Sequence, residues 1–205
     1  MIADSDPIIA NIVANILPVD ISDGADLIKR KGQRGASVLM PLVMREEWQV
    51  ILTQRPQTMP THAGQIAFPG GKREAGESAR QAALRETEEE IGLKESAINI
   101  IGRLPSFNAV GAYRITPFIG IVNPSANIIR DPREVDEVFE TPLSFLMDPK
   151  NHVPRDVFFG GEDHRFYDMP YDEPDGTHRN IWGMTAMTMY RLYQRVHLGV
   201  FETDY

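Results

Sequence analysis

Residues 68–93 read FPGGKREAGESARQAALRETEEEIGL and decide how the rest of the chain is interpreted. A loop at Gly70-Gly71 leads into a segment in which Leu84, Thr87 and Ile91 recur at three- and four-residue spacing. That spacing predicts a helix with one buried stripe. The expected start and end signals of the helix are Gly76, Glu77 and Ser78 before it and Gly92 after it.

Three carboxylates occupy the stripe beside the buried one. Glu89 and Glu90 lie three and four residues beyond Glu86, so a helix is expected to bring both of them near Glu86. Like charges at this spacing repel, and Arg85 can relieve only part of the repulsion by reaching Glu88 or Glu89. A solvated acidic face is one interpretation. The other, favoured by the adjoining Gly-rich loop, is a site for a hard divalent cation that prefers oxygen ligands.

The stretch resembles the Nudix box, G-x5-E-x7-R-E-U-x-E-E-x-G-U, in which U is aliphatic. The matching positions are Gly71, Glu77, Arg85, Glu86, Glu89, Glu90, Gly92 and Leu93. Thr87 stands where an aliphatic residue is usual, and it still suits a helix core. The resemblance implies an α/β fold, an α/β/α sandwich with a mixed sheet between helices, and hydrolysis of a diphosphate linked to another group.

The resemblance also implies roles for the box residues. Glu86 and Glu90 are expected to bind Mg²⁺ or Mn²⁺ directly, with the carbonyl of Gly71 as a further oxygen ligand. Glu89 is expected to bind metal through water, to bind a further ion or to act as general base. Arg85 is expected to orient these carboxylates, and Glu77 to form a salt bridge within the box. Glu134 and Glu137 lie where many Nudix proteins supply a late carboxylate, although a solvated helix start is the simpler expectation for them.

A second resemblance lies just before the box. Residues 51–71, ILTQRPQTMPTHAGQIAFPGG, are similar to the motif of coenzyme A pyrophosphatases, in which L-L-T-x-R leads through a His-x-G-Gln segment to F-P-G-G. The matching residues are Leu52, Thr53, Arg55, His62, Gly64, Gln65 and the run 68–71. Pro60-Thr61 stands where many members carry basic residues, and the run 181–186, IWGMTA, also resembles that subfamily.

This narrower resemblance implies cleavage of coenzyme A to 3′,5′-ADP and 4′-phosphopantetheine. Arg55 is the first candidate for a phosphate contact. Lys72 follows the Gly-Gly loop and can face the same cleft. His62 and Gln65 either bind substrate or order the loop. Asn108, Arg114 and Arg34 are further candidates. Other substrates remain open, namely ADP-ribose, a dinucleotide or a nucleoside triphosphate, as do a silent nucleotide- or RNA-binding Nudix domain and a purely structural domain.

Composition sets limits on these alternatives. The chain has 205 residues, 42% of them hydrophobic and 24% charged, as in an ordinary globular domain. The absence of cysteine excludes disulfides and thiolate sites and suits a reducing compartment, so a cytoplasmic location is expected. A net charge of −8 argues against a nucleic-acid partner. No apolar run reaches the length of a membrane span.

The order of elements predicts one Nudix domain over residues 35–205, preceded by a helix and connector at 1–34. The helix is expected after Ser5 or Asp6, with Pro7 just inside it; it either docks on its own domain, the favoured interpretation, or forms a subunit contact in a homodimer. The run 29–31 (Lys-Arg-Lys) is interpreted as solvated.

Farther along, we expect a hairpin over 37–54, strands over 66–68, 98–104 and 115–122, the last at an edge or bulge because of Pro117. A short helix is expected after Pro142, then a hairpin joining 157–159 to 165–167, a loop over 169–179 and a final helix over 181–198. In that last helix Trp182, Met189, Tyr190 and Tyr193 are interpreted as core residues.

Overall fold

The computed structural model describes residues 6–20, 32–58, 62–109, 113–159 and 161–200. A mixed sheet with strand order β3-β2-β1-β7-β5 forms its centre, with β4 pairing β1, β6 pairing β7 and β8 pairing β2. The strands of this sheet are β1 (Arg34–Met44), β2 (Trp48–Gln54), β3 (Ile66–Ala67), β4 (Gly70–Lys72), β5 (Ile98–Arg103), β6 (Phe107–Asn108), β7 (Tyr113–Val122) and β8 (Glu137–Pro142). The pairing of β1 with β7 is parallel and the other pairings are antiparallel.

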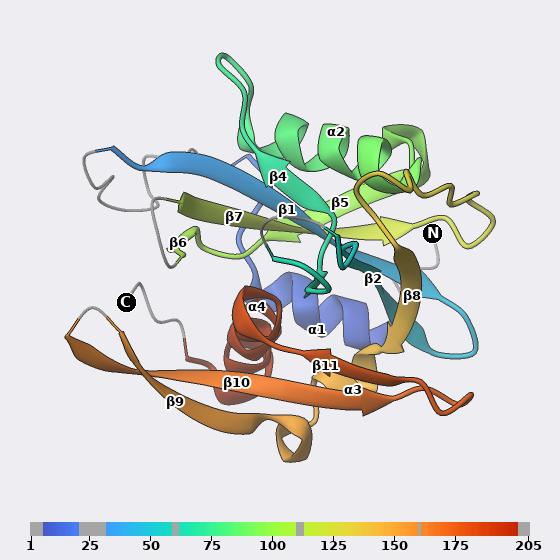
Figure 1. The fold of residues 1–205 in the computed structure, drawn as a ribbon. Coiled ribbons are helices and arrows are strands. Elements are labelled where there is room, and N and C mark those ends of the chain that lie inside the picture. The colour runs from blue at the N-terminus through green and yellow to red at the C-terminus, as the bar shows by residue number, and fades with distance from the viewer. Residues whose placement is uncertain (1–5, 21–31, 59–61, 110–112, 160, 201–205) are drawn as a thin grey trace.

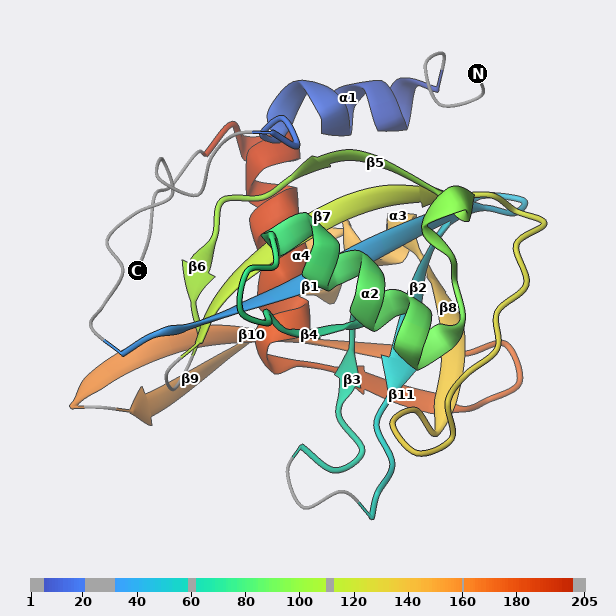
Figure 2. The same cartoon turned by 90° about the horizontal axis from the view of Figure 1, so that it is seen from above.

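Helices cover both faces of this sheet, which confirms the expected sandwich (Figures 1 and 2). On one face lies α2 (Ala79–Ile91); on the other lie α1 (Pro7–Asn15) and α4 (Gly183–Tyr193). The short elements are α3 (Leu143–Leu146), the 3₁₀ turns η3 (Glu95–Ala97) and η4 (Pro149–Asn151), and η5 (Gln194–Leu198), a π-helical turn that continues α4.

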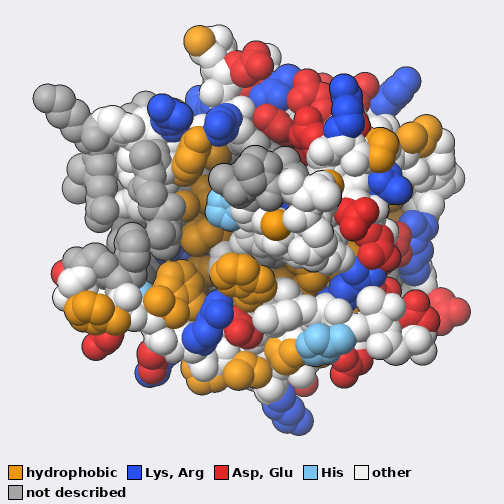
Figure 3. Space-filling model, viewed as in Figure 1, with side chains coloured by type: hydrophobic (Ala, Val, Ile, Leu, Met, Phe, Trp, Pro, Cys, Tyr) orange, Lys and Arg blue, Asp and Glu red, His pale blue; other side chains and the backbone are white. Residues whose placement is uncertain are grey.

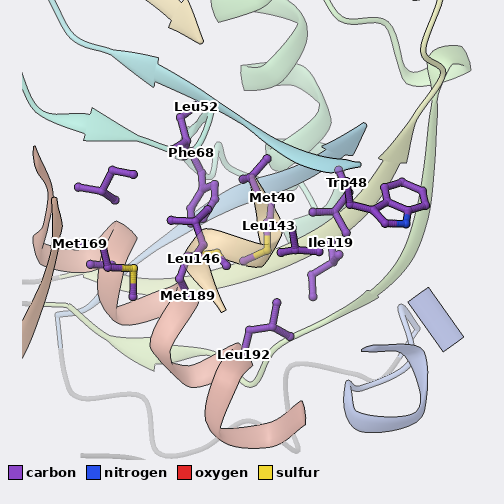
Figure 4. Packing of buried hydrophobic residues seen from close by; sticks show 14 of the residues in the cluster. Met40, Trp48, Leu52, Phe68, Ile119, Leu143, Leu146, Met169, Met189 and Leu192 are labelled. Atoms are coloured by element: carbon purple, nitrogen blue, oxygen red, sulfur yellow. The ribbon is translucent and has the colours of Figure 1, made fainter. Parts of the chain in front are cut away.

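Successive side chains of β1 point to opposite faces of the sheet, so this one strand contributes to the core on both sides. Met40 and Leu42 are fully buried in the cluster that includes α1 and α4, whereas Leu39 and Val43 are fully buried in clusters with α2. A strand covered on both faces is a near-continuous apolar run, which is how residues 37–44 read. Figure 4 shows Met40 and Phe68 facing Met189 and Leu192 of α4 across the larger core.

A second sheet lies beside α4, and it contains the expected hairpin of 157–159 with 165–167 together with a strand that the sequence did not indicate. It consists of β9 (Val153–Phe159), β10 (Glu162–Asp172) and β11 (His178–Ile181), in the order β11-β10-β9. The expected loop over 169–179 is therefore wrong. Met169 pairs with Ile181 and both are fully buried, so these two apolar positions hold β10 and β11 against the core.

Two further expectations are corrected. The sequence predicts Pro117 at an edge or a bulge; it does not lie at an edge, because β7 runs between β1 and β5, and the register shift of the β5–β7 pairing lies at Ile100 and Gly102, beyond Pro117. β5 ends at Arg103, opposite Phe118, and the carbonyl of Pro117 still accepts a hydrogen bond from the amide of Leu104 at 2.9 Å, although proline has no amide hydrogen to donate. The expected helix start around Glu134 and Glu137 is instead a turn followed by strand β8.

The N-terminal helix forms as expected. Asp6 caps it, with its carboxylate accepting from the amides of Ile8 and Ile9, and Pro7 follows in the first turn. Ile9 and Ile12 are buried in the main core, and the carbonyl of Asn15 accepts a 2.8 Å hydrogen bond from Arg195. The charged run at 29–31 lies outside the described residues.

Among the described residues, no helix is long and apolar enough to cross a membrane.

Candidate active site

Helix α2 begins and ends where its sequence indicates. The hydroxyl of Ser78 accepts from the amide of Gln81 at 3.1 Å, and the Gln81 side chain accepts from the amide of Ser78 at 2.9 Å, which makes a complete capping box. Gly92 ends the helix at φ 67°, a left-handed conformation that suits glycine. The buried Thr87 hydroxyl donates to the carbonyl of Ala83 at 2.6 Å, so this side chain fits the helix core despite its polarity.

Arg85 holds the carboxylates of the helix in place. Its Nε and Nη2 donate to Glu77 at 2.9 and 3.1 Å, and Nη1 donates to Glu86 at 3.0 Å and Glu89 at 2.8 Å. Nη2 also donates to the carbonyl of Lys72 at 3.0 Å, which ties α2 to strand β4. These hydrogen bonds raise the pKa of Arg85 and keep it charged, and the one to Glu77 contributes most. The expected orienting role of Arg85 thus has a geometric basis.

Glu90 is the buried carboxylate of the set. It is 4% exposed, and its Oε2 accepts a hydrogen bond from the amide of Gly70 at 3.2 Å. Burial raises the pKa of Glu90 to about 8; the Gly70 amide opposes this rise and the negative charge of Glu86 adds to it. A buried carboxylate with such a pKa is stabilised in its charged form by a cation placed beside it.

Glu86 lies against the backbone of Gly71. A Cβ atom at Gly71 would come within 2.4 Å of the Glu86 carboxyl carbon, so the absence of a side chain there makes room for this carboxylate. Burial raises the pKa of Glu86 as well, against the lowering effect of Arg85. Glu134 contributes to the raised pKa of both Glu86 and Glu90, so its negative charge acts on the same site.

Glu86 and Glu89 share one nitrogen of Arg85, and the charge of Glu86 acts on Glu90, so the box carboxylates are neighbours without forming a ready-made metal cage. Within the described ranges, no group of three or more His, Cys, Asp or Glu side chains is arranged to hold a metal ion. The side chain of Glu89 is 55% exposed and is bound to Arg85, whereas Glu90 accepts from the amide of Gly70. Mg²⁺ commonly uses one or two carboxylates, waters and substrate phosphates instead of an all-protein cage. Glu86, Glu90 and the backbone oxygen of Gly71 fit that kind of ligand set.

Comparison with known proteins decides the family. The NUDIX domain model matches residues 33–159. The chain belongs to the Nudix family. It is similar to the uncharacterized Nudix hydrolase NudL of Photorhabdus laumondii, with 35% identity over 80% of this chain and 86% of that one. It also shares 40% identity with NudL of Escherichia coli K12, over 75% and 78% of the two chains.

A solved structure supports the same fold. The MutT/nudix family protein from Enterococcus faecalis superposes with a TM-score of 0.53 over 87% of this chain and 67% of that one, at 16% identity. This Nudix hydrolase is therefore an enzyme that acts on a diphosphate, and enzymes of the family generally use divalent metal ions.

The loop before the box brings Arg55 and Gln65 together in this Nudix hydrolase. The amide of Arg55 donates to the carbonyl of Gln65 at 3.0 Å, and the amide of Gln65 donates to the carbonyl of His62 at 3.1 Å. The positive charge of Arg55 acts on the pKa of Glu90. Its Nε is buried and meets no hydrogen-bond acceptor among the described residues. An arginine in this position has donor capacity left for a substrate oxygen.

The other predicted substrate residues are placed differently. His62 is exposed at φ 57°, a left-handed conformation uncommon for a residue with a side chain, which marks a tight turn. The side-chain nitrogen of Gln65 approaches Gly183, where a Cβ would lie 3.3 Å from it. Lys72 is exposed, with Nζ 5.9 Å from the centre of the Tyr113 ring.

Two residues have roles that the sequence did not indicate. Glu137 is ion-paired with Arg179 at 2.7 Å, so it is held by β11 and serves the packing of the two sheets. Trp182 is not a core residue as expected, since it is 39% exposed and Arg155 lies over its ring at 5.1 Å. Trp182 is the N-cap residue of α4, just after strand β11, and its ring lies at the surface.

An open hollow of about 540 Å³ lies over the outer face of α2. It contacts Arg85 and Glu89 but neither Glu86 nor Glu90. The buried pair of carboxylates therefore faces the sheet side of the helix, where Gly70 and Gly71 lie.

Proposed function

We propose that this Nudix hydrolase cleaves the diphosphate of coenzyme A or its acyl derivatives. Water adds to one phosphorus and the P–O–P bond breaks, so the products are 3′,5′-ADP and 4′-phosphopantetheine or its acyl form. The observation that carries the proposal is the 51–71 segment. Its Arg55 lies where its charge acts on Glu90, and its Gln65 lies against both Arg55 and the start of α4.

The proposed cation ligands are Glu86, Glu90 and the carbonyl of Gly71. Mg²⁺ or Mn²⁺ bound there would neutralise the diphosphate oxygens and lower the pKa of an attacking water. Glu89, the most exposed of the three box carboxylates, is assigned a water-mediated metal contact, a contact with a further ion, or the general-base role. Arg85 positions Glu86 and Glu89 through its 3.0 and 2.8 Å hydrogen bonds and does not touch substrate.

Arg55 is assigned to the diphosphate. Its charge already acts on Glu90, so a diphosphate oxygen on a cation held by Glu90 would lie within the field of Arg55. His62 and Gln65 are assigned to ordering the loop that carries Arg55, and through it to the substrate cleft. Lys72 directly follows Gly71 in the sequence, whereas Arg55 precedes it, so the two basic residues lie on either side of Gly71 along the chain.

The test is a chromatographic comparison of substrates. The protein is incubated with coenzyme A, ADP-ribose, NADH, diadenosine polyphosphates and a nucleoside triphosphate, each with Mg²⁺, with Mn²⁺ and with chelator. Glu90→Gln protein prepared in the same way serves as the blank for contaminating phosphatases. The expected result is metal-dependent release of 3′,5′-ADP from coenzyme A, faster than any other cleavage.

The other outcomes separate the alternatives. Faster cleavage of ADP-ribose or a dinucleotide would keep the Nudix chemistry and overturn the coenzyme A assignment. Lack of cleavage of every substrate in the panel would overturn it as well.

A further inference from the structure

Three side chains meet at one corner of the main sheet. Arg34 begins β1 and pairs with Tyr113, the first residue of β7. Lys72, the last residue of β4, pairs with Ala36, which is two positions along β1 from Arg34. Residues two apart on a strand, and their partners in register, share one face of the sheet. Arg34, Lys72 and Tyr113 therefore project from the same face.

The corner carries excess positive charge. Hydrogen bonds from Lys72 first, and also from Arg34, lower the pKa of the Tyr113 phenol, and Lys72 Nζ lies 5.9 Å from its ring centre. No carboxylate is ion-paired with Arg34 or Lys72 in the part of the chain that the structure describes. Two cations thus share one neutral oxygen, in a protein whose net charge is −8.

The corner is joined through the backbone of β4 to the groups that bind the box residues of α2. Gly70, whose amide binds Glu90, is two residues from Lys72 on β4, about 7 Å along the strand. The carbonyl of Lys72 accepts from Arg85. The shared face is the one that carries Met40 and Leu42 farther along β1, toward α4. Figure 3 shows basic side chains on the upper left of this view, above an apolar hollow between the two layers.

We propose that Arg34, Lys72 and Tyr113 form an anion subsite for a phosphomonoester of the substrate, distinct from the diphosphate that is cleaved. An arginine fork and a lysine ammonium suit a phosphomonoester, whose oxygens are stronger acceptors than a phenol. On binding, the two cations turn from Tyr113 to the phosphate, and the phenol donates to it. The proposal rests on the proposed function, because coenzyme A carries such a group on its ribose while ADP-ribose does not.

Binding measurements test the subsite without relying on turnover. Calorimetric titration with 3′,5′-ADP and with 5′-AMP compares two ligands that differ only by the phosphomonoester. Wild-type protein is expected to bind 3′,5′-ADP more tightly. Lys72→Met and Arg34→Gln should each weaken 3′,5′-ADP binding by roughly 10- to 100-fold, the effect of losing one charge-assisted hydrogen bond, and leave 5′-AMP binding unchanged.

The matched control is Lys94→Met, an exposed lysine beyond the end of α2, which should bind both ligands like wild type. Lys72 is exposed, so its variant is expected to fold even if Arg34→Gln does not. Turnover gives a second readout, because Lys72→Met should reduce kcat/KM for coenzyme A and spare dephospho-coenzyme A.

Two results would overturn the subsite. Equal losses for both ligands would place Lys72 and Arg34 at the diphosphate or in the fold. A wild-type preference for 3′,5′-ADP that survives both substitutions would place the subsite elsewhere. If wild type prefers 3′,5′-ADP through these residues yet does not cleave coenzyme A, the proposed function fails and the subsite stands. If coenzyme A is cleaved and neither ligand is preferred, the subsite fails and the function stands.

Discussion

Arg85 allows several acidic side chains to lie close together on helix α2. It donates to Glu77, Glu86 and Glu89 at once, so carboxylates that would repel each other share one cation. Glu90 is left outside this network and instead accepts from the Gly70 amide. The result is one group of three carboxylates whose repulsion a shared cation partly relieves, and one buried carboxylate, with a raised pKa, that has no hydrogen bond from a cation among the described residues.

Replacing Glu90 by Gln tests this division. The amide keeps the shape and can still accept from Gly70, so the melting temperature should not fall. It removes the negative charge proposed to hold the cation, so kcat should drop by roughly 100-fold or more. Steady-state kinetics on the best substrate with Mg²⁺ measures this. Glu88→Gln, on the exposed side of the helix, is the control, and near-normal turnover of Glu90→Gln would remove Glu90 from the mechanism.

Gly71→Ala tests the space beside Glu86. The new methyl group would lie 2.4 Å from the Glu86 carboxyl carbon, so the carboxylate must move. A displacement of about 1 Å at a catalytic group can cost roughly 100-fold in rate. The control is Gly120→Ala, whose added Cβ meets Ile98 at 2.8 Å in the core, and which should lower stability without the same loss of kcat. Equal kcat losses in the two variants would make the effect at Gly71 a general packing defect.

At the scale of the element, local signals specify α2 almost completely. Its start is fixed by the reciprocal hydrogen bonds of Ser78 and Gln81, and its end by the left-handed Gly92. Both are short-range interactions that a sequence reveals directly. The burial of Glu90 is different, because it depends on where Gly70 and β4 lie relative to the helix, and β4 was not predicted as a strand.

Elsewhere too, elements specified by short-range signals were predicted correctly, and elements that depend on pairing with distant segments were not. The hairpin of β1 and β2 follows from two apolar runs separated by a short charged turn, and the helix α1 follows from an Asp-Pro start. Strands β8 and β11 were missed because polar residues interrupt them, and their pairing partners lie far away in the chain. The two basic residues Arg34 and Lys72 lie in separate segments of the sequence. Only the register of β1 with β4 and β7 shows that they lie on the same corner of the sheet.

Ser78→Ala tests how much the cap contributes. Loss of a side-chain cap costs about 1 kcal/mol of unfolding free energy. Urea unfolding should therefore show a lower midpoint with an unchanged slope, since the surface exposed on unfolding is the same. Ser96→Ala, an exposed serine in η3, should leave the midpoint in place. An unchanged midpoint in Ser78→Ala would show that packing alone fixes the start of α2.

At the scale of the molecule, Arg179 joins the two sheets. It belongs to β11 of the second sheet, yet it donates to Gln54 of β2 at 2.6 Å and to Glu137 of β8 at 2.7 and 2.8 Å. It also pairs with Glu173, and its guanidinium lies 4.3 Å from the centre of the Phe139 ring. A buried arginine requires such partners, because an unpaired buried charge is costly.

Glu137→Gln should therefore weaken the fold in a pH-dependent way. Hydrogen bonding from Arg179 holds the pKa of Glu137 below its ordinary value of 4.5. A carboxylate whose pKa is lowered on folding stabilises the native state above its unfolded pKa, and that contribution is lost as the pH falls through the folded pKa. The variant should thus be less stable than wild type near neutral pH, by roughly 1 kcal/mol, since the Glu137 side chain is half exposed.

The difference should shrink as the pH falls below 4.5 and disappear once Glu137 is protonated in both states of the wild type. Chemical unfolding from pH 3 to 8 measures it, with Glu162→Gln, an exposed glutamate at the start of β10, as the control. A difference that stays constant across this range would mean that the pKa of Glu137 is the same in the folded and unfolded states, so that its charge does not hold β8 to β11. In that case the second sheet would be fixed to the first by the apolar contacts of Met169 and Ile181, and Arg179 would only fill the space between them.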